Sequence, residues 1–131
     1  MTADEFLKWE KGAWGVDFKM EYVDLAGGDI EAGLLLSQII FWFLPSKSGK
    51  SKMTIERDGR PWIAKKRADW WKETRLAQKR FDRAVTILEE RGLVIKGDFH
   101  FRRVRMVHVT LDLGEFLRQL EALLERDSAK K

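Results

Sequence analysis

The sequence predicts a single α+β domain over residues 1–131, with a helical core, a small antiparallel β-hairpin and an additional C-terminal helix. Its length of 131 residues is typical of one domain. Its apolar content of 44%, which includes six Trp and eight Phe, supplies enough large side chains for a core. Apolar residues recur with helical spacing in some segments and with period two in others, which predicts both helices and strands. We expect the core over about residues 28–112, an N-terminal extension over 1–27 and a C-terminal helix over about 113–127.

The first strong helix signal is the almost wholly apolar segment that begins at Ile30. Asp29 suits the N-cap because its carboxylate can accept from the first free amides, and Pro45 ends the helix. A helix that is apolar on nearly all sides is expected at the centre of the domain. In the extension before it, residues 16–25 fit either a short strand or a helical turn. Four large side chains could pack on the body: Phe6, Leu7, Trp9 and Trp14.

A tight hairpin is predicted around the Asp58-Gly59 pair. The flanking segments 53–56 and 61–64 alternate in apolar character, and an Asp-Gly turn between two such segments is a strong hairpin signal. Pro61 lacks an amide hydrogen, which favours an edge strand.

Two helices are predicted after this hairpin. The first covers residues 65–73, with Trp70 and Trp71 on its buried face. A short turn leads to the second, over residues 76–91, whose apolar residues form one stripe at spacings of three and four. Gly92 is expected to end it, because glycine readily adopts the left-handed conformation that closes a helix.

A basic β-ribbon is expected next. Residues 93–95 and 104–111 have strand character, and the segment between them, 96–103, is the candidate wing. Arginines stand at 102, 103 and 105; exposed arginine on an edge strand can also prevent aggregation, but three within four residues favour a functional role. A helix, a turn, a second helix and a basic ribbon form the outline of a winged helix-turn-helix, a fold that binds nucleic acid.

The charge distribution supports this interpretation. Residues 57–105 hold 15 Lys and Arg against 7 Asp and Glu, a net charge of +8, whereas the rest of the chain holds 10 basic and 14 acidic residues, a net charge of −4. A concentrated basic segment is expected of a surface that meets phosphates. An ordinary solvated surface is the alternative.

In this interpretation the protein binds double-stranded DNA in a sequence-specific or structure-specific manner, and the outward face of helix 76–91 enters the major groove. Arg75, Gln78 and Lys79 are expected to meet base edges, because these side chain types match guanine and adenine. Arg80 and Arg83 are expected on phosphates. The remaining predicted contacts lie on the wing and the short helix: Lys96, His100, Arg102, Arg103 and Arg105, and Lys65, Lys66 and Arg67. For helix 76–91 alone, an exposed charged face without a specific role is an equal alternative, and the wing favours DNA binding.

Four motifs in order carry a resemblance to a known family: LLLSQIIFWF, RDGRPWIA, ADWW and ILEERGLVIKG. Over about residues 28–113 the chain resembles the winged-helix N-terminal domain of phage and plasmid replication-initiation proteins of the primosomal initiator type. The resemblance implies DNA binding in replication initiation or control of a phage, plasmid or other mobile element. The family usually opens its short helix with Ser or Thr, where this chain has Lys65-Lys66-Arg67.

The C-terminal helix is expected to begin at Asp112, which has capping-box spacing to Glu115. Four of its leucines follow the spacing of a coiled-coil seam over less than two heptads: Leu113, Leu117, Leu120 and Leu124. The helix either packs on its own domain or forms a homodimer that sets two recognition helices about one DNA turn apart. Residues 127–131 are expected to fray.

Composition argues against several other function classes. The chain has no Cys, its N-terminus lacks the pattern of a signal peptide, and its longest apolar run, 32–44, is shorter than the roughly 20 residues of a membrane span. We therefore expect a cytoplasmic protein. The segment 47–51 lacks the first glycine of a phosphate-binding loop, and His100 and His108 have few potential co-ligands.

We accordingly expect no enzyme activity, metal, cofactor or small-molecule substrate. Two alternatives to a replication role stay open. One is a small dimeric winged-helix transcriptional repressor, and the other is a winged helix that serves as a protein-binding adaptor.

Overall fold

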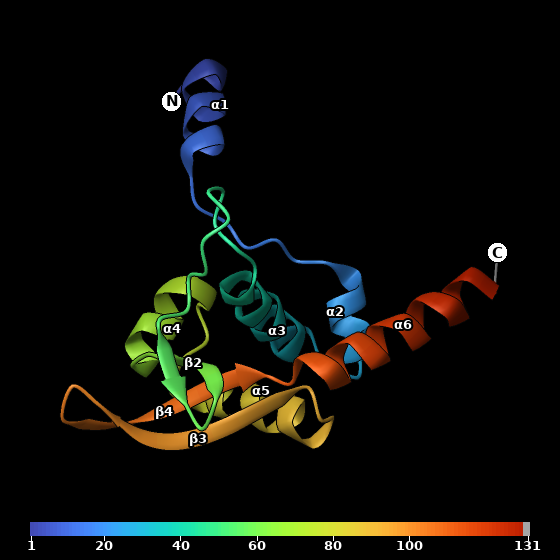
Figure 1. The fold of residues 1–131 in the computed structure, drawn as a ribbon. Coiled ribbons are helices and arrows are strands. Elements are labelled where there is room, and N and C mark those ends of the chain that lie inside the picture. Colours follow the sequence, from blue (N-terminus) through green and yellow to red (C-terminus); the bar gives the residue numbers. More distant parts are fainter. Residues whose placement is uncertain (130–131) are drawn as a thin grey trace.

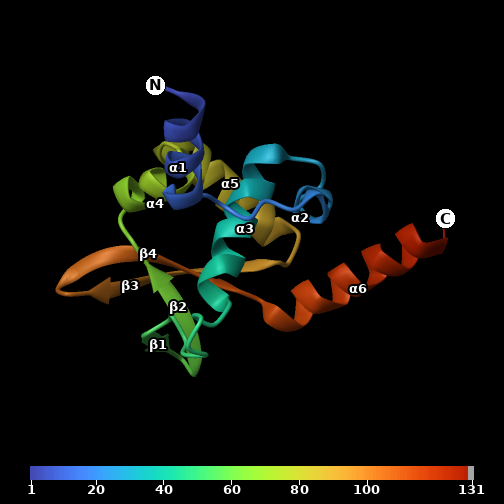
Figure 2. The same ribbon diagram turned by 90° about the horizontal axis from the view of Figure 1, so that it is seen from above.

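The computed structural model describes residues 1–129, and over them it shows a mixed α+β fold of six helices and one four-stranded antiparallel sheet (Figures 1 and 2). The predicted α+β class is therefore confirmed. In chain order the elements are α1 (Ala3–Gly12), α2 (Met20–Leu25), α3 (Ile30–Phe43), β1 (Ile55–Arg57), β2 (Arg60–Ala64), α4 (Arg67–Thr74), α5 (Gln78–Glu90), β3 (Val94–Phe101), β4 (Val104–Leu111) and α6 (Leu113–Ala129).

The apolar helix α3 forms the centre of the core, as its sequence predicts. Asp29 caps it by accepting from the Ala32 amide at 2.9 Å. The ambiguous N-terminal segment is helical as α2, which packs on α3 so closely that a Cβ at Gly33 would lie 2.8 Å from the Cα of Val23. Glycine is the residue that permits this approach.

Helices α4 and α5 are joined by the three residues 75–77. Trp70 of α4 stacks on Phe81 of α5 in the core, with ring centroids 5.3 Å apart. Trp71 was expected on the same buried face, but this expectation is wrong, because α4 buries only one side and leaves Trp71 47% exposed.

Helix α5 begins at Gln78, two residues later than predicted, because the N-cap Ala77 has an extended backbone with a ψ of 168°. Leu76 is buried within the turn. It ends in a Schellman motif: the Gly92 amide donates to Glu89 O, and the Leu93 amide donates to Leu88 O. Gly92 has a φ of 76°, so the predicted helix end is confirmed.

The sheet has the strand order β1-β2-β4-β3. The Asp58-Gly59 hairpin is confirmed as β1 and β2, but the edge position expected from Pro61 is wrong, because β2 is an inner strand. Its ladder with β4 is limited to Ile63 and Ala64, so no bond to β4 requires an amide hydrogen at Pro61.

The basic ribbon is a hairpin, as expected, but its first strand is longer than the predicted segment 93–95 and takes in most of the candidate wing 96–103. Strands β3 and β4 pair continuously from Val94–Leu111 to Phe101–Val104, and only Arg102 and Arg103 form the turn. Val94 is buried, and residues 95–101 alternate between half-buried and exposed, with Phe99 and Phe101 among the half-buried ones. The hairpin projects well beyond the helical body (Figure 1).

Helix α6 begins after Asp112, which accepts from the Glu115 amide at 3.1 Å. It packs on the domain through Phe116 and Leu123, and Tyr22 of α2 lies beside Phe116 with ring centroids 6.3 Å apart. The helix continues to Ala129, so the fraying expected from residue 127 is wrong for 127–129, while residues 130–131 lie outside the described part.

Helix α1 stands away from the body (Figure 1). None of its residues is buried, and Phe6 stacks on Trp9 of the same helix. Four N-terminal side chains could have packed on the body. Among their aromatic rings, only that of Trp14 meets a ring of the body: it lies edge-on to Phe41 of α3, with ring centroids 6.4 Å apart.

Candidate nucleic-acid interface

A groove runs between the start of α4, the start of α5 and the outer part of the β3–β4 hairpin. We call it the basic groove, and its lining residues are Lys65, Lys66, Arg67, Gln78, Phe81, Asp98, Val104, Arg105, Met106 and Val107. It brings together predicted contacts from the short helix, the second helix and the hairpin. The fold therefore places three basic segments, separate in sequence, around one concave surface.

The first turn of α5 forms one end of this surface. Ala77 at the N-cap offers no side-chain acceptor, and no acidic residue lies in the first turn. Gln78, Lys79 and Arg80 are all exposed there. Free amides and the positive end of the helix dipole add to the two cations, so this turn attracts anions.

Arg75 does not extend outward as a base-reading side chain would. Its backbone has a left-handed φ of 61°, and its guanidinium donates to Trp71 O at 3.1 Å and also to Lys72 O. The same guanidinium lies 4.5 Å from the centre of the Trp71 ring. Arg75 thus closes the C-terminal end of α4 and covers part of an exposed indole.

The two predicted phosphate contacts on α5 are engaged with the start of α3. Arg83 pairs with Asp29 and lies 3.6 Å from Glu31, while Arg80 lies 3.6 Å from the other Glu31 oxygen. Hydrogen bonds from Arg83 and from the Ala32 amide hold the pKa of Asp29 below its ordinary value, and Asp29 raises the pKa of Arg83. These pairs are solvent-exposed on the arginine side, so a phosphate can exchange with the carboxylates at small cost.

Four other predicted contacts also have acidic partners. Lys65 pairs with Glu73 in a largely buried contact, with both side chains 16% exposed. Three pairs are more exposed: Arg67 with Asp82 at 3.0 Å, Arg105 with Asp98 at 3.0 Å and Lys96 with Glu89 at 4.0 Å. Lys65 therefore stabilises the fold, whereas the other three basic side chains remain accessible to a ligand.

Among the described residues, the predicted cations without an ion pair are Lys66, Arg75, Lys79, Arg102 and Arg103. Arg102 and Arg103 form the hairpin tip and adopt φ values of 52° and 68°. Two consecutive left-handed residues define the tight turn that Asn-Gly prefers, so arginine at both positions is strained. His100 is exposed just before the tip, and its carbonyl accepts from Arg57 at 3.1 Å.

Two polar groups that support this surface were not expected from the sequence. Glu73 Oε1 accepts from the Gln38 amide and, at 2.8 Å, from the Trp42 indole, while its other oxygen holds Lys65. His108 is fully buried between Trp62 and Phe99, and its Nδ1 lies 2.9 Å from Met106 O. Both clusters join residues from different elements, so no local pattern marks them.

Residues 1–129 lack both a metal-binding cluster and a membrane-spanning helix. That part of the chain holds no group of three or more His, Cys, Asp or Glu side chains arranged to bind a metal ion. None of its helices combines the length and apolar character required to cross a bilayer. Comparison of the chain with protein-family models, with curated proteins and with solved structures finds no match.

Proposed function

We propose that the chain is a winged helix-turn-helix protein that binds double-stranded DNA and catalyses no reaction. The observation that carries the proposal is the basic groove, which joins the uncapped first turn of α5 to the outer part of the β3–β4 hairpin. Helix α5 enters the major groove, and the hairpin acts as the wing along the phosphate backbone.

The exposed polar side chains along this surface have two different roles, contact with base edges and contact with phosphates. Gln78 and Lys79 in the first turn of α5 are placed to meet base edges. Lys66 and the hairpin tip supply phosphate contacts on either side of the groove. Arg80 and Arg83 join them when phosphates replace Glu31 and Asp29.

The strained hairpin tip supports a role for its side chains. A non-glycine residue in the left-handed region costs about 1–2 kcal/mol, and the tip holds two of them in succession. Such strain is typical of functional positions, where a side chain needed for function is kept although another residue would form the turn at a lower free energy. Two arginines at the end of a projecting hairpin suit the backbone or the minor groove of DNA.

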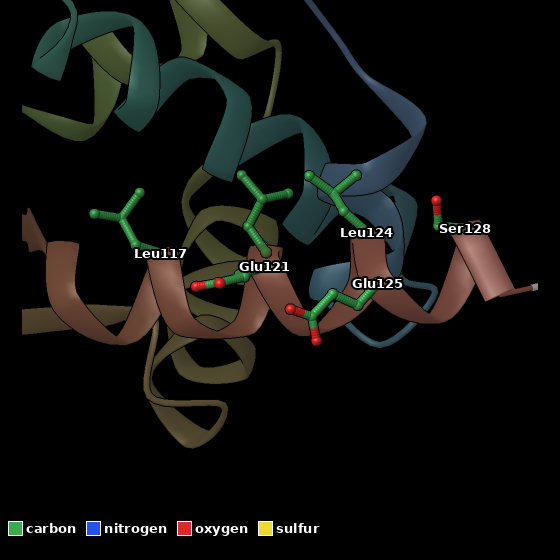
Figure 3. Close-up of a pocket in the computed structure, with 6 residues that line it drawn as sticks. Leu117, Glu121, Leu124, Glu125 and Ser128 are labelled. Atoms are coloured by element: carbon green, nitrogen blue, oxygen red, sulfur yellow. The ribbon is translucent and has the colours of Figure 1, made fainter.

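The process served is proposed from the resemblance described above: replication initiation or control of a phage, plasmid or other mobile element, in the cytoplasm of its host. A second candidate is a small dimeric repressor, favoured by the exposed leucines of α6. Leu117 and Leu124 project from the same side of the helix, beside Glu121 and Glu125 (Figure 3). Leu113 is also exposed, whereas Leu120 packs partly against its own domain.

Titration of duplex DNA at increasing salt tests the proposal. Neutralising several phosphates predicts that log K falls with log salt at a slope of about −0.9 per phosphate contact. Lys79→Ala is expected to weaken binding, and Gln78→Ala is expected to relax sequence preference at particular bases. No binding to any duplex at low salt contradicts DNA binding and favours the alternative of a protein-binding adaptor.

A further inference from the structure

We propose that a hollow at the start of α5 binds an unpaired nucleotide of DNA, with its base stacked on the indole of Trp71. We call it the α5 hollow, and its lining residues are Trp71, Arg75, Ala77, Gln78, Lys79 and Arg80. The inference rests on the DNA binding proposed above and adds a preference for DNA in which a duplex meets a single strand.

The aromatic surface of the hollow is the first support. Trp71 is 47% exposed, whereas its neighbour Trp70 is 1% exposed in the core. The planar guanidinium of Arg75 already lies 4.5 Å from the centre of the Trp71 ring. Trp71 keeps its 47% exposure with this guanidinium in place, so part of the indole remains available to a nucleobase, a larger flat group that stacks on aromatic rings.

The charge of the hollow is the second support. Three of its six lining residues are cations, namely Arg75, Lys79 and Arg80, and none is a carboxylate. Lys79 has no ion pair among the described residues, and Arg80 has only the 3.6 Å contact with Glu31. A ligand that offers both a flat aromatic face and a negative charge fits this combination, and each nucleotide carries both.

The base must be unpaired for a geometric reason. Within a duplex the faces of each base are covered by its neighbours, and only the edges are accessible in the grooves. Trp71 lies on α4 beside the first turn of α5, the part of the protein that we place in the major groove. The stacked base therefore lies at the margin of the duplex site, where a strand leaves the helix.

The test compares a blunt duplex with the same duplex carrying a thymine tail of about five nucleotides, at either strand end, and with a tail of equal length whose sites are abasic. The abasic tail keeps the phosphates and removes the bases. Wild type, Trp71→Ala and Trp71→Phe are titrated, with circular dichroism to verify that each is folded. A 2-aminopurine in the tail reports stacking through quenching of its fluorescence.

We expect the wild type to bind the thymine-tailed duplex about 5- to 150-fold more tightly than the blunt one, the range of a single base–aromatic stack. The abasic tail and Trp71→Ala should each abolish this preference, while Trp71→Phe retains part of it and Trp71→Ala binds the blunt duplex normally. Equal affinity for tailed and blunt duplexes, or a preference that survives Trp71→Ala, overturns the inference and leaves duplex binding intact. Absence of binding to the blunt duplex and to both tailed duplexes overturns both proposals.

Discussion

The strain at Arg102 and Arg103 leads to a prediction in which stability and affinity change in opposite directions. Replacing the hairpin tip by Asn-Gly, as Arg102→Asn with Arg103→Gly, supplies residues that adopt the left-handed conformation readily. We expect the free energy of unfolding to rise by about 1–2 kcal/mol and the affinity for duplex DNA to fall. Thermal unfolding and salt-dependent DNA titration measure the two effects.

A control must separate the effect of losing two positive charges from the effect of losing the two arginine side chains at the hairpin tip. The control is Lys47→Ala with Lys50→Ala, which removes the same charge from the exposed loop after α3. We expect this control to reduce the affinity for duplex DNA less than the double substitution at the hairpin tip does. Equal weakening by both double variants would show that the tip has no special role.

The Asp29–Arg83 pair predicts a pH-dependent stability. Asp29→Asn keeps an N-cap oxygen for Ala32 and loses the charge that Arg83 binds. Because the pKa of Asp29 is lowered in the folded protein, its contribution is present above the ordinary Asp value of about 3.9 and is lost as the pH falls through the lowered pKa. The wild type should therefore exceed the variant in stability at neutral pH, and the difference should shrink in acid.

Urea denaturation at neutral and acid pH measures this difference. Glu121→Gln, which removes one exposed carboxylate from α6, is the charge-matched control and should show no such convergence. A gap between wild type and Asp29→Asn that persists unchanged in acid would contradict the assignment.

At the scale of elements, Glu73 joins α3, α4 and the end of β2. It binds Lys65, Gln38 and Trp42 in a site where both charged side chains are 16% exposed. Glu73→Ala leaves Lys65 without its counter-charge, so we expect the free energy of unfolding to fall by about 3 kcal/mol, near the lower end for a broken buried pair. Chemical denaturation measures the loss.

The companion variant is Glu73→Gln with Lys65→Met, which removes both charges together and keeps a side-chain oxygen that can accept from Gln38 and Trp42. It should recover much of the stability, because a buried ion pair contributes less than the cost of leaving one partner alone. If Glu73→Ala unfolds at the same denaturant concentration as the wild type, the network does not hold these elements together.

Elements with strong local signals were predicted well from the sequence. The Asp29 cap, the Asp58-Gly59 turn and the Gly92 helix end all depend on backbone conformations that a few adjacent residues determine. The length of β3 was missed, although exposed Lys96, Asp98 and His100 do alternate with half-buried residues. Charged residues next to a glycine are typical of a loop. They form a strand here because they pair with β4, which lies further along the chain.

The candidate site was predicted in part. The sequence shows directly which residues are basic, but it does not show which distant residues form ion pairs with them. The sequence identified the basic residues that the fold gathers around the basic groove. It did not show that Arg80 and Arg83 meet the start of α3, about 50 residues earlier in the chain. It also placed Trp71 inside, because two adjacent tryptophans give no sign of which one faces the core.

At the scale of the whole molecule, α6 predicts self-association. Leu117 and Leu124 are 51% and 49% exposed on a helix that extends from the domain (Figure 2). We expect a concentration-dependent dimer, because an exposed apolar stripe is most simply covered by a second copy. Leu117→Glu with Leu124→Glu should give a monomer of 15.4 kDa that remains folded. Sedimentation or light scattering measures the mass.

Arg126→Glu alters the charge of the same helix outside the leucine stripe and is the control. It should dimerise like the wild type. A wild-type mass of one chain at every concentration would exclude the dimer and weaken the repressor candidate.

The strained tip also bears on how the hairpin forms. A turn that disfavours its own conformation is a poor nucleus, so closure of β3 and β4 depends on contacts at a distance from residues 102 and 103. Those contacts are the rings of Trp62, Phe99 and His108, which meet 5.2–6.4 Å apart nearer the helical body. We therefore expect the two strands to pair from the helical body outward and to separate from the tip inward. In the proposed complex with DNA, we expect the base of such a hairpin to stay fixed while its end adjusts to the DNA surface that it meets.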